Sequence, residues 1–307
     1  MDIMIVLNQM IQLFLIISLG YLLRKMNCID DLFNEKLSKL VLDVTMPAMI
    51  VASVLKTDGT APLHLPSIIA SCILLIIILP ILSYFIVVLL HISKEQRGLY
   101  LFMMMYPNVG FMGFPVMKSI FGADAILSTA IINICFNVSL FTVGKSMMNL
   151  GSWERQKFSA RNIISPGMVA SLGAIVLYGF PIRFPEILTD TLEMVGSMTT
   201  PLAMLLIGVT LAKLPAKEIW GDYKVYLFSG LIQIILPIGI YPILQMFIPN
   251  ELIRGITFII IAMPVANSAV LFANEFHKDA SFAAKTIFMS TLMSIVTIPF
   301  LVYCFLL

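Results

Sequence analysis

Two short segments, far apart in the chain, place proline, glycine and asparagine inside otherwise apolar sequence. The first reads Tyr106-Pro-Asn-Val-Gly-Phe-Met-Gly-Phe-Pro115, and the second reads Met263-Pro-Val-Ala-Asn-Ser268. An interior proline costs an α-helix about 3 kcal/mol and a glycine about 1 kcal/mol relative to alanine, so each segment predicts a broken helix. A break frees backbone amides and carbonyls for a ligand, and the amino end of the half-helix that follows carries partial positive charge. The pair of breaks therefore predicts a site for a small anion, against the alternative of two structural proline kinks.

The side chains of these segments divide into two predicted roles. The residues expected to contact the ligand are Asn108, Gly110, Gly113, Asn267 and Ser268. The residues expected to form the breaks, where two helices would cross near the membrane midplane, are Pro107, Pro115 and Pro264.

Three more polar side chains lie inside apolar runs. Asp43, four residues before Pro47, is the one carboxylate well inside a run; it could have a proton-coupling or substrate-coupling role, form buried hydrogen bonds, or lie near the cytoplasmic interface. Asn133 and Asn137 are four residues apart and so share one helix face. They could line the substrate cavity or tie neighbouring helices together.

Enzyme and cofactor chemistry is not indicated. Cys28, Cys72, Cys135 and Cys304 have the spacing of no metal or redox site. The tripeptide beginning at Gly144 resembles the tail of a phosphate-binding loop, but serine stands where that loop requires its first glycine. We therefore expect no enzyme activity, no metal and no cofactor, so that transport would draw on gradients.

The composition assigns most of the chain to a lipid environment. Of its 307 residues 60% are apolar and 12% are charged, against about 25% charged residues in a soluble domain. The net charge of +2 is too small to suggest a nucleic-acid partner. Ten apolar runs long enough to cross a membrane lie at about residues 3–25, 36–55, 66–91, 98–120, 124–148, 162–180, 187–212, 224–248, 252–275 and 281–306.

The positions of the basic residues predict the orientation, because cytoplasmic loops collect lysine and arginine. Loops after the odd-numbered runs contain Arg24, Lys25, Lys36, Lys39, Lys94, Arg97, Arg155, Lys157, Arg161, Lys213, Lys217, Lys224 and Lys278. Loops after the even-numbered runs contain only Lys56, Lys118, Arg183 and Arg254. We expect a multi-pass protein of the cell (plasma or inner) membrane with both termini outside.

An internal repeat is predicted by five short matches at nearly one offset. The matched pairs are Ser18-Leu19-Gly20 with Ser171-Leu172-Gly173, Thr45-Met46-Pro47 with Thr199-Thr200-Pro201, Leu79-Pro80 with Leu236-Pro237, Pro107 with Pro264, and Asp124-Ala125 with Asp279-Ala280. Five helices per copy is an odd number, so the second copy would enter the membrane from the opposite side. The prediction is two inverted five-helix repeats, residues 1–150 and 151–307, as in alternating-access carriers.

The pattern Asn108-x-Gly110-x-x-Gly113-x-Pro115, the Thr-x-Pro or Thr-Pro signatures of the second and seventh runs and the length resemble the auxin efflux carrier family. The bacterial members of that family are associated with malate and malonate. The resemblance implies an all-α fold similar to bile-acid symporters and sodium/proton antiporters, with crossing helices broken at or beside Pro107 and at Pro264. It also implies a scaffold of the first, second, sixth and seventh helices, a transport domain of the other six, and a homodimer formed through the scaffold. The chain departs from the plant carriers in its short central loop, residues 149–161.

These observations together predict a secondary transporter of small organic anions such as carboxylates. The alternatives are a cation-coupled symporter or sodium/proton exchanger on the same fold and, in another class, a non-transporting membrane receptor. The expected partners are the substrate, membrane lipid and a second copy of the chain.

Overall fold

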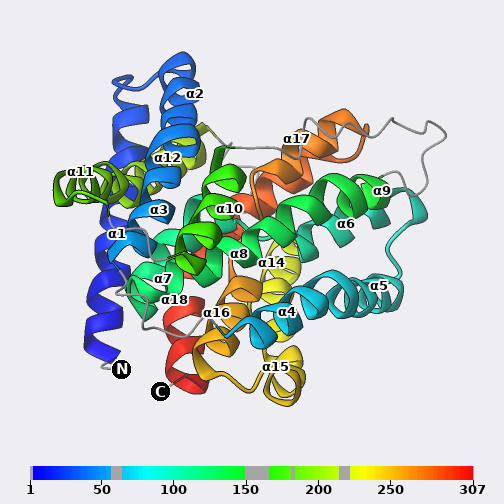
Figure 1. Ribbon diagram of the computed structural model, residues 1–307. Helices are drawn as coiled ribbons and strands as arrows, with labels where there is room; N and C mark the ends of the chain where they lie inside the picture. The colour runs from blue at the N-terminus through cyan, green and yellow to red at the C-terminus, as the bar shows by residue number, and fades with distance from the viewer. Residues whose placement is uncertain (1–2, 57–63, 149–165, 181–183, 214–221, 307) are drawn as a thin grey trace. The chain divides into compact units, whose positions relative to one another are not determined.

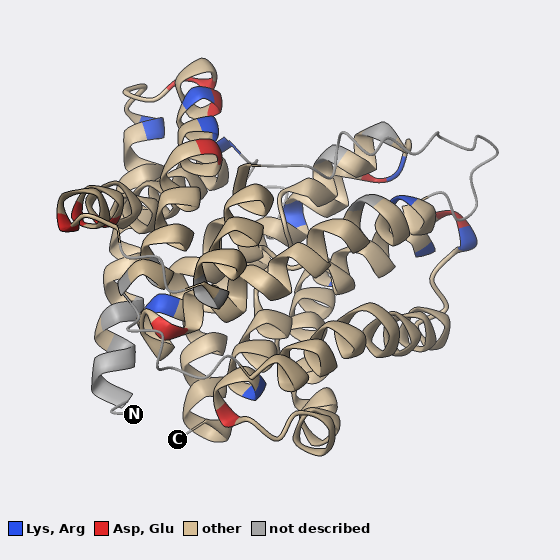
Figure 2. Ribbon diagram, in the orientation of Figure 1, with Lys and Arg blue, Asp and Glu red and all other residues tan. Residues whose placement is uncertain are grey.

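The computed structural model describes residues 3–56, 64–148, 166–180, 184–213 and 222–306, which form helices joined by short turns, with no strand beyond one isolated β-bridge (Figure 1). Within these residues, five helices are long and apolar enough to cross a membrane: Leu65–Leu89, Asp124–Met148, Glu186–Lys213, Tyr223–Phe247 and Ala280–Phe305. Charged residues lie mostly at helix ends (Figure 2). An all-helical, multi-pass membrane protein is thus supported, whereas the count of ten spans and the inverted repeat stay predictions.

Some of the sequence predictions fall outside the described residues. These are the central loop at 149–161 and five of the basic residues used for orientation, namely Arg155, Lys157, Arg161, Arg183 and Lys217.

The chain divides into two compact units, each assembled from three separate stretches of sequence. Unit 1 comprises residues 1–64, 110–134 and 164–213, and unit 2 comprises residues 65–109, 135–163 and 214–307. Unit 2 contains the elements that surround the two breaks at Pro107 and Pro264. The stretch 110–134, which the sequence analysis assigns wholly to a transport domain, clusters with unit 1.

Unit 1 contains the helices of the predicted scaffold. Its elements are α1 (Ile3–Lys25), α2 (Asp31–Leu40), the π-helical η1 (Val41–Thr45), α3 (Met46–Lys56), most of π-helical η3 (Val109–Gly113), α7 (Phe114–Phe121), the first part of α8 (Asp124–Ser139), α10 (Pro166–Gly179), α11 (Glu186–Ser197) and α12 (Thr199–Lys213). A buried cluster that includes Met46, Met49, Ile50 and Phe114 forms the core between α3, α7, α8 and α10.

Two glycines allow α1 and α12 to pack with their backbones in contact. A Cβ on Gly20 would collide with the carbonyl of Leu205, and a Cβ on Gly208 would collide with the carbonyl of Ile17. Small residues at such crossings let membrane helices approach closely. Close approach matters because van der Waals packing, and not the hydrophobic effect, stabilises contacts between helices in lipid.

Unit 2 contains the elements that position the breaks. They are α4 (Leu65–Ile73), π-helical η2 (Leu74–Ile78), α5 (Leu79–Leu89), α6 (Lys94–Met105), the end of α8, π-helical η4 (Leu140–Gly144), α9 (Lys145–Met148), α14 (Tyr223–Gly230), π-helical η6 (Leu231–Ile235), α15 (Leu236–Phe247), α16 (Glu251–Ala262), α17 (Ser268–Glu275) and α18 (Ala280–Phe305). The two π-helical turns η2 and η6 each directly precede a Leu-Pro pair, at Pro80 and Pro237.

Helix boundaries differ from the predicted runs, and two places illustrate this. The second run was expected to begin at residue 36, but α2 begins at Asp31 because the Asp30 carboxylate accepts a hydrogen bond from the Phe33 amide at 2.7 Å. The run expected at residues 187–212 is interrupted between α11 and α12 at Met198. Hydropathy marks the apolar part of a helix, and polar first turns extend beyond it.

Candidate functional site

The first break begins at Tyr106, a buried tyrosine whose hydroxyl is hydrogen-bonded. Helix α6 ends at Tyr106, whose ring is buried and whose hydroxyl hydrogen-bonds the Ser139 carbonyl at 3.0 Å and the Ser139 hydroxyl at 2.9 Å. Gly144 makes room for this ring, because a Cβ there would lie 2.9 Å from a ring carbon of Tyr106. Tyr106 thereby fixes the point at which the chain leaves α6 for Pro107.

The two breaks meet in a short antiparallel bridge within unit 2. The Asn108 amide donates to the Pro264 carbonyl at 2.8 Å, the Ala266 amide donates to the Tyr106 carbonyl at 3.1 Å, and Pro107 faces Val265 across the pair. In this register neither bridge residue donates to the other, so the missing N–H of Pro107 leaves no bond unmade. The bridge satisfies backbone groups that would each cost several kcal/mol if left unpaired in lipid.

A buried polar network holds the second break against α18. The Val265 amide donates to the Ser290 hydroxyl at 3.2 Å. The amide nitrogen of the Gln233 side chain donates to the Ser290 carbonyl at 2.5 Å, and its oxygen accepts from the Thr297 hydroxyl at 3.1 Å. Gln233 is 0% exposed and lies in η6, so both hydrogen-bonding ends of its amide are used inside the protein.

These contacts correct one expectation about the breaks. The freed backbone amides were expected to be available to a ligand, but those of Asn108, Val265 and Ala266 are paired. The physical reason is that the two broken backbones lie close enough to hydrogen-bond each other. This pairing has a lower free energy than a site whose backbone groups stay unpaired until a ligand binds.

The amino end of α17 is where donors remain. Asn267 is the residue that would cap this helix, yet its side chain forms no capping hydrogen bond. The Ser268 hydroxyl is buried and has no hydrogen-bond partner among the described residues. The backbone amides of these two residues also donate no hydrogen bond to a described acceptor. A helix amino terminus with unpaired donors and a positive dipole end is a favourable place for an anion.

The remaining helix-break residues are split between the two units. Asn108 is 6% exposed and belongs to unit 2, as do Asn267 and Ser268. Gly110, Gly113 and Pro115 belong to unit 1, in η3 and the start of α7. A Cβ on Gly110 would meet no heavy atom within 4 Å, so packing does not explain this glycine, and its predicted contact with the ligand stays a prediction.

The other polar candidates are not gathered at the bridge. Asn133 and Asn137 are half-buried along α8, and the boundary between the units passes between them. Asp43 lies in the π-helical turn η1 and is exposed. No described residue hydrogen-bonds the Asp43 carboxylate, so the structure offers no support for its buried hydrogen-bonding alternative.

Sequence reasoning missed four residues that build the site: Tyr106 as an anchor, Gln233, Ser290 and Thr297. Gln233 carried a usable signal, since it is the single amide in an apolar stretch running from Leu231 to Pro237. Ser290 and Thr297 carried none, because serine and threonine are common in membrane helices, where they bond their own backbone. In the described part of the chain, no group of three His, Cys, Asp or Glu side chains could hold a metal ion.

Comparison with known proteins assigns the chain to a family. Residues 5–159 and 154–302 match the family described as membrane transport protein. The chain is 24% identical to an uncharacterised transporter of Methanothermobacter thermautotrophicus over 92% of this chain and 93% of the relative. It is 22% identical to an uncharacterised transporter of Methanocaldococcus jannaschii over 96% and 97% of the two chains.

A third relative carries a substrate in its name. A protein of Rhizobium meliloti provisionally named a malonate transporter is 25% identical over 64% of each chain. The family match covers almost the whole chain. The chain therefore belongs to the membrane transport protein family, which is the auxin efflux carrier family, and its role is that of a membrane transporter.

Proposed function

We propose that this protein is a secondary active transporter of small organic anions, with carboxylates as the substrate class. The observation that carries the proposal is the set of unpaired donors at the amino end of α17, beside the bridge between the breaks. The name of the Rhizobium meliloti relative supports the same substrate class.

A carboxylate suits these donors for electrostatic reasons. The backbone amides of Asn267 and Ser268, the Ser268 hydroxyl and the Asn267 side-chain amide are all neutral, so an empty site contains no buried charge to desolvate. The positive end of the α17 dipole favours an anion once one enters. Each hydrogen bond to a charged acceptor contributes about 1.5 to 3 kcal/mol.

The direct test measures binding to purified protein after donors are removed one at a time. Ser268→Ala removes the buried hydroxyl and should weaken malonate binding about tenfold or more, which is the loss of one charge-assisted hydrogen bond. Asn267→Leu should cause a loss of similar size. The matched control is Ser281→Ala, which makes the same change in the first turn of α18, where the serine is exposed.

The outcomes separate the proposal from its alternatives. Weakened binding in the α17 variants and unchanged binding in the control would support an anion site there. Unchanged binding in all three variants would remove α17 from the site. Binding or transport that requires sodium would instead favour the cation-coupled symporter.

Alternating access by two inverted repeats is part of the same proposal. The turns η2 and η6 begin at Leu74 and Leu231, which are 157 residues apart, and this equals the offset between Pro107 and Pro264. A shared departure from α-helical geometry at one offset supports the repeat. Labelling of single cysteines with an impermeant reagent tests it: positions 56 and 254 should react in intact cells and positions 157 and 217 should not. The reverse pattern would overturn both orientation and repeat. A homodimer through the scaffold, which consists of the first, second, sixth and seventh predicted helices, completes the proposal.

A further inference from the structure

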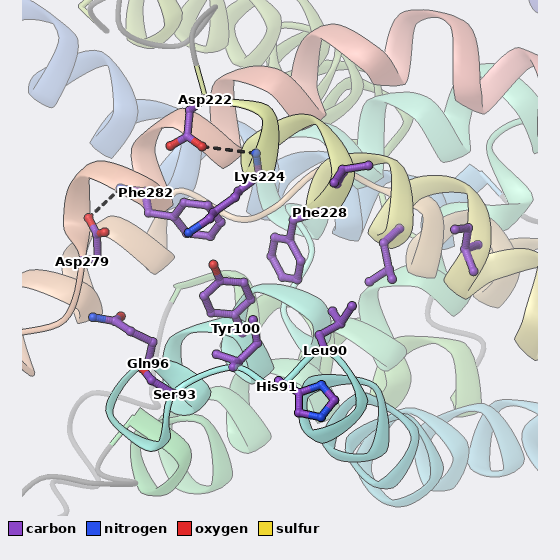
Figure 3. Close-up of a pocket in the computed structure, with 14 residues that line it drawn as sticks. Leu90, His91, Ser93, Gln96, Tyr100, Asp222, Lys224, Phe228, Asp279 and Phe282 are labelled. Carbon is purple, nitrogen blue, oxygen red and sulfur yellow. Dashed lines mark hydrogen bonds between the residues drawn. The ribbon is translucent and has the colours of Figure 1, made fainter.

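A cavity lies in unit 2 outside the bridge region, lined by fourteen residues drawn from the stretches 90–100, 222–235 and 279–282. Its volume is about 750 Å³, within the range of about 300 to 1,000 Å³ typical of ligand pockets. Its walls are the turn between α5 and α6, the first part of α6, α14 with η6, and the start of α18 (Figure 3). The predicted orientation places these turns on the cytoplasmic side of the membrane.

One end of the cavity is polar and carries acceptors with spare capacity. Asp222 and Asp279 cap α14 and α18 through one carboxylate oxygen each, at 3.2 Å from the Lys224 amide and 2.8 Å from the Phe282 amide. No described residue bonds their second oxygens. The side-chain oxygen of Gln96 is buried and has no partner among the described residues. Three acceptors with unused capacity thus face the same end of the cavity (Figure 3).

The charge of the lining favours a ligand that carries both a cation and an anion. The charged side chains are two aspartates and Lys224, whose ammonium forms no ion pair with a described residue. Two aspartates and one lysine give these side chains a net charge of −1. A purely anionic group would meet two carboxylates, whereas an ammonium would pair with them and leave Lys224 for a phosphate.

Three aromatic side chains in the lining determine which kind of ammonium group fits. The rings of Tyr100, Phe228 and Phe282 lie with centroids 4.6, 4.9 and 5.9 Å apart. Rings at these distances are in direct contact, so no cation fits between them as a quaternary ammonium does in an aromatic cage. A primary ammonium, which donates hydrogen bonds to carboxylates, matches this lining better than a trimethylammonium, which cannot donate any.

The other end of the cavity is an exposed apolar stripe. Leu227, Leu231 and Ile235 recur every four residues along α14 and η6 and so share one face. Leu227 is 68% exposed and Ile235 is 62% exposed. This stripe leads from the polar end toward the middle of the membrane span, which is the path that an acyl chain would take.

We propose that the cavity is a binding site for a phospholipid with an ethanolamine headgroup. The ammonium lies against Asp222, Asp279 and Gln96, the phosphate meets Lys224, and an acyl chain covers the stripe at Leu227, Leu231 and Ile235. The lipid holds together the ends of α6, α14 and α18. These helices lead directly to the bridge region, because Tyr106 caps the end of α6, Gln233 lies in η6 directly after α14, and Ser290 lies in α18. Occupancy therefore stiffens the unit that contains the breaks.

The test measures thermal unfolding of the full-length protein in detergent with added lipids of identical acyl chains. Phosphatidylethanolamine should raise the unfolding midpoint more than phosphatidylcholine or phosphatidylglycerol. The double variant Asp222→Asn/Asp279→Asn removes both charges but keeps both caps, because asparagine caps helices as well as aspartate. It should bind phosphatidylethanolamine about tenfold more weakly, while the control Asp124→Asn, at the exposed start of α8, should bind it as the wild type does.

Other outcomes overturn the proposal in distinct ways. Equal stabilisation by the three lipids would reduce the cavity to non-specific lipid contact. A preference for phosphatidylglycerol would make Lys224 the centre of an anionic lipid site. Binding of water-soluble glycerophosphoethanolamine as tightly as the lipid would mean that the apolar stripe has no part and that the ligand is a soluble molecule. None of these results depends on which substrate the protein transports.

Discussion

The Gln233 side chain offers the most direct test of how the bridge region is held. Gln233→Leu keeps a similar volume in η6 and removes both ends of the amide. The donor bond to the Ser290 carbonyl, at 2.5 Å, and the acceptor bond from Thr297, at 3.1 Å, are both lost. Hydrogen bonds between membrane helices contribute about 0.6 kcal/mol on average and up to about 1.7. The expected loss of stability is therefore about 1 to 3 kcal/mol.

A double-mutant cycle with Thr297→Val separates the pair from general damage. Either single change leaves a buried polar group without its partner, whereas the double change removes both groups, which costs less than the sum of the singles. The expected coupling is about 0.5 to 2 kcal/mol. The measurement is equilibrium unfolding in mixed micelles with increasing denaturing detergent. Gln245→Leu, the same substitution on the exposed face of α15, is the matched control and should change little.

The functional readout distinguishes a positioning role from a purely structural one. Because Ser290 accepts from the Val265 amide, loosening it should displace the start of α17 and lower malonate affinity, even in variants that remain folded at the assay temperature. The network would be refuted if Gln233→Leu had the same free energy of unfolding as the wild type and if the effects of Gln233→Leu and Thr297→Val were additive. A stability loss with unchanged affinity would restrict Gln233 to packing.

Three further predictions address the other polar residues. Asn108→Leu should fold but bind substrate about tenfold more weakly, measured by titration; unchanged affinity would make the first break a hinge. If Asp43 carries a coupling proton, Asp43→Asn should abolish the pH dependence of uptake by proteoliposomes, and an unaltered pH profile would leave it without that role. The ion pair with Lys213 lowers the pKa of Asp31 below 3.8, so its stabilising effect is present above that pH and is lost as the pH falls through the lowered pKa. The unfolding midpoint of Asp31→Asn should therefore lie below wild type near pH 6, and this difference should shrink as the pH falls below 3.8, while Asp190→Asn, at an exposed site on α11, should match wild type throughout.

Much of the fold class was accessible from sequence because the bilayer imposes strong constraints. A lipid-facing segment must be apolar and must satisfy its own backbone bonds, so hydropathy predicted an all-helical membrane protein, and the motif around Asn108 predicted the family. Helix ends were less accessible. The start of α2 depends on the capping residue Asp30, and a hydropathy profile does not detect polar capping residues.

The sequence predicts where the two helices break, but it does not predict which groups hydrogen-bond the backbone at the breaks. Proline with asparagine nearby, at positions 107–108 and 264–267, predicts an interrupted helix, whereas proline alone does not suffice, since Pro242 and Pro299 lie inside the continuous helices α15 and α18. Which freed amides stay unpaired depends on how two distant segments approach, and no local pattern encodes that. Gln233 and Ser290 become neighbours across 57 residues of sequence, so only the tertiary structure reveals them as one network.

The arrangement of the second break explains how an anion could be attracted without a buried lysine. Pro264 has no N–H, the Val265 amide is taken by Ser290, and the Ala266 amide is taken by Tyr106. The first donors left over are those of Asn267 and Ser268, which begin α17 and so coincide with the positive end of its dipole. A lysine there would carry its full desolvation cost whenever the site was empty. Neutral donors avoid that cost, so an empty site of this kind contains no unpaired charge.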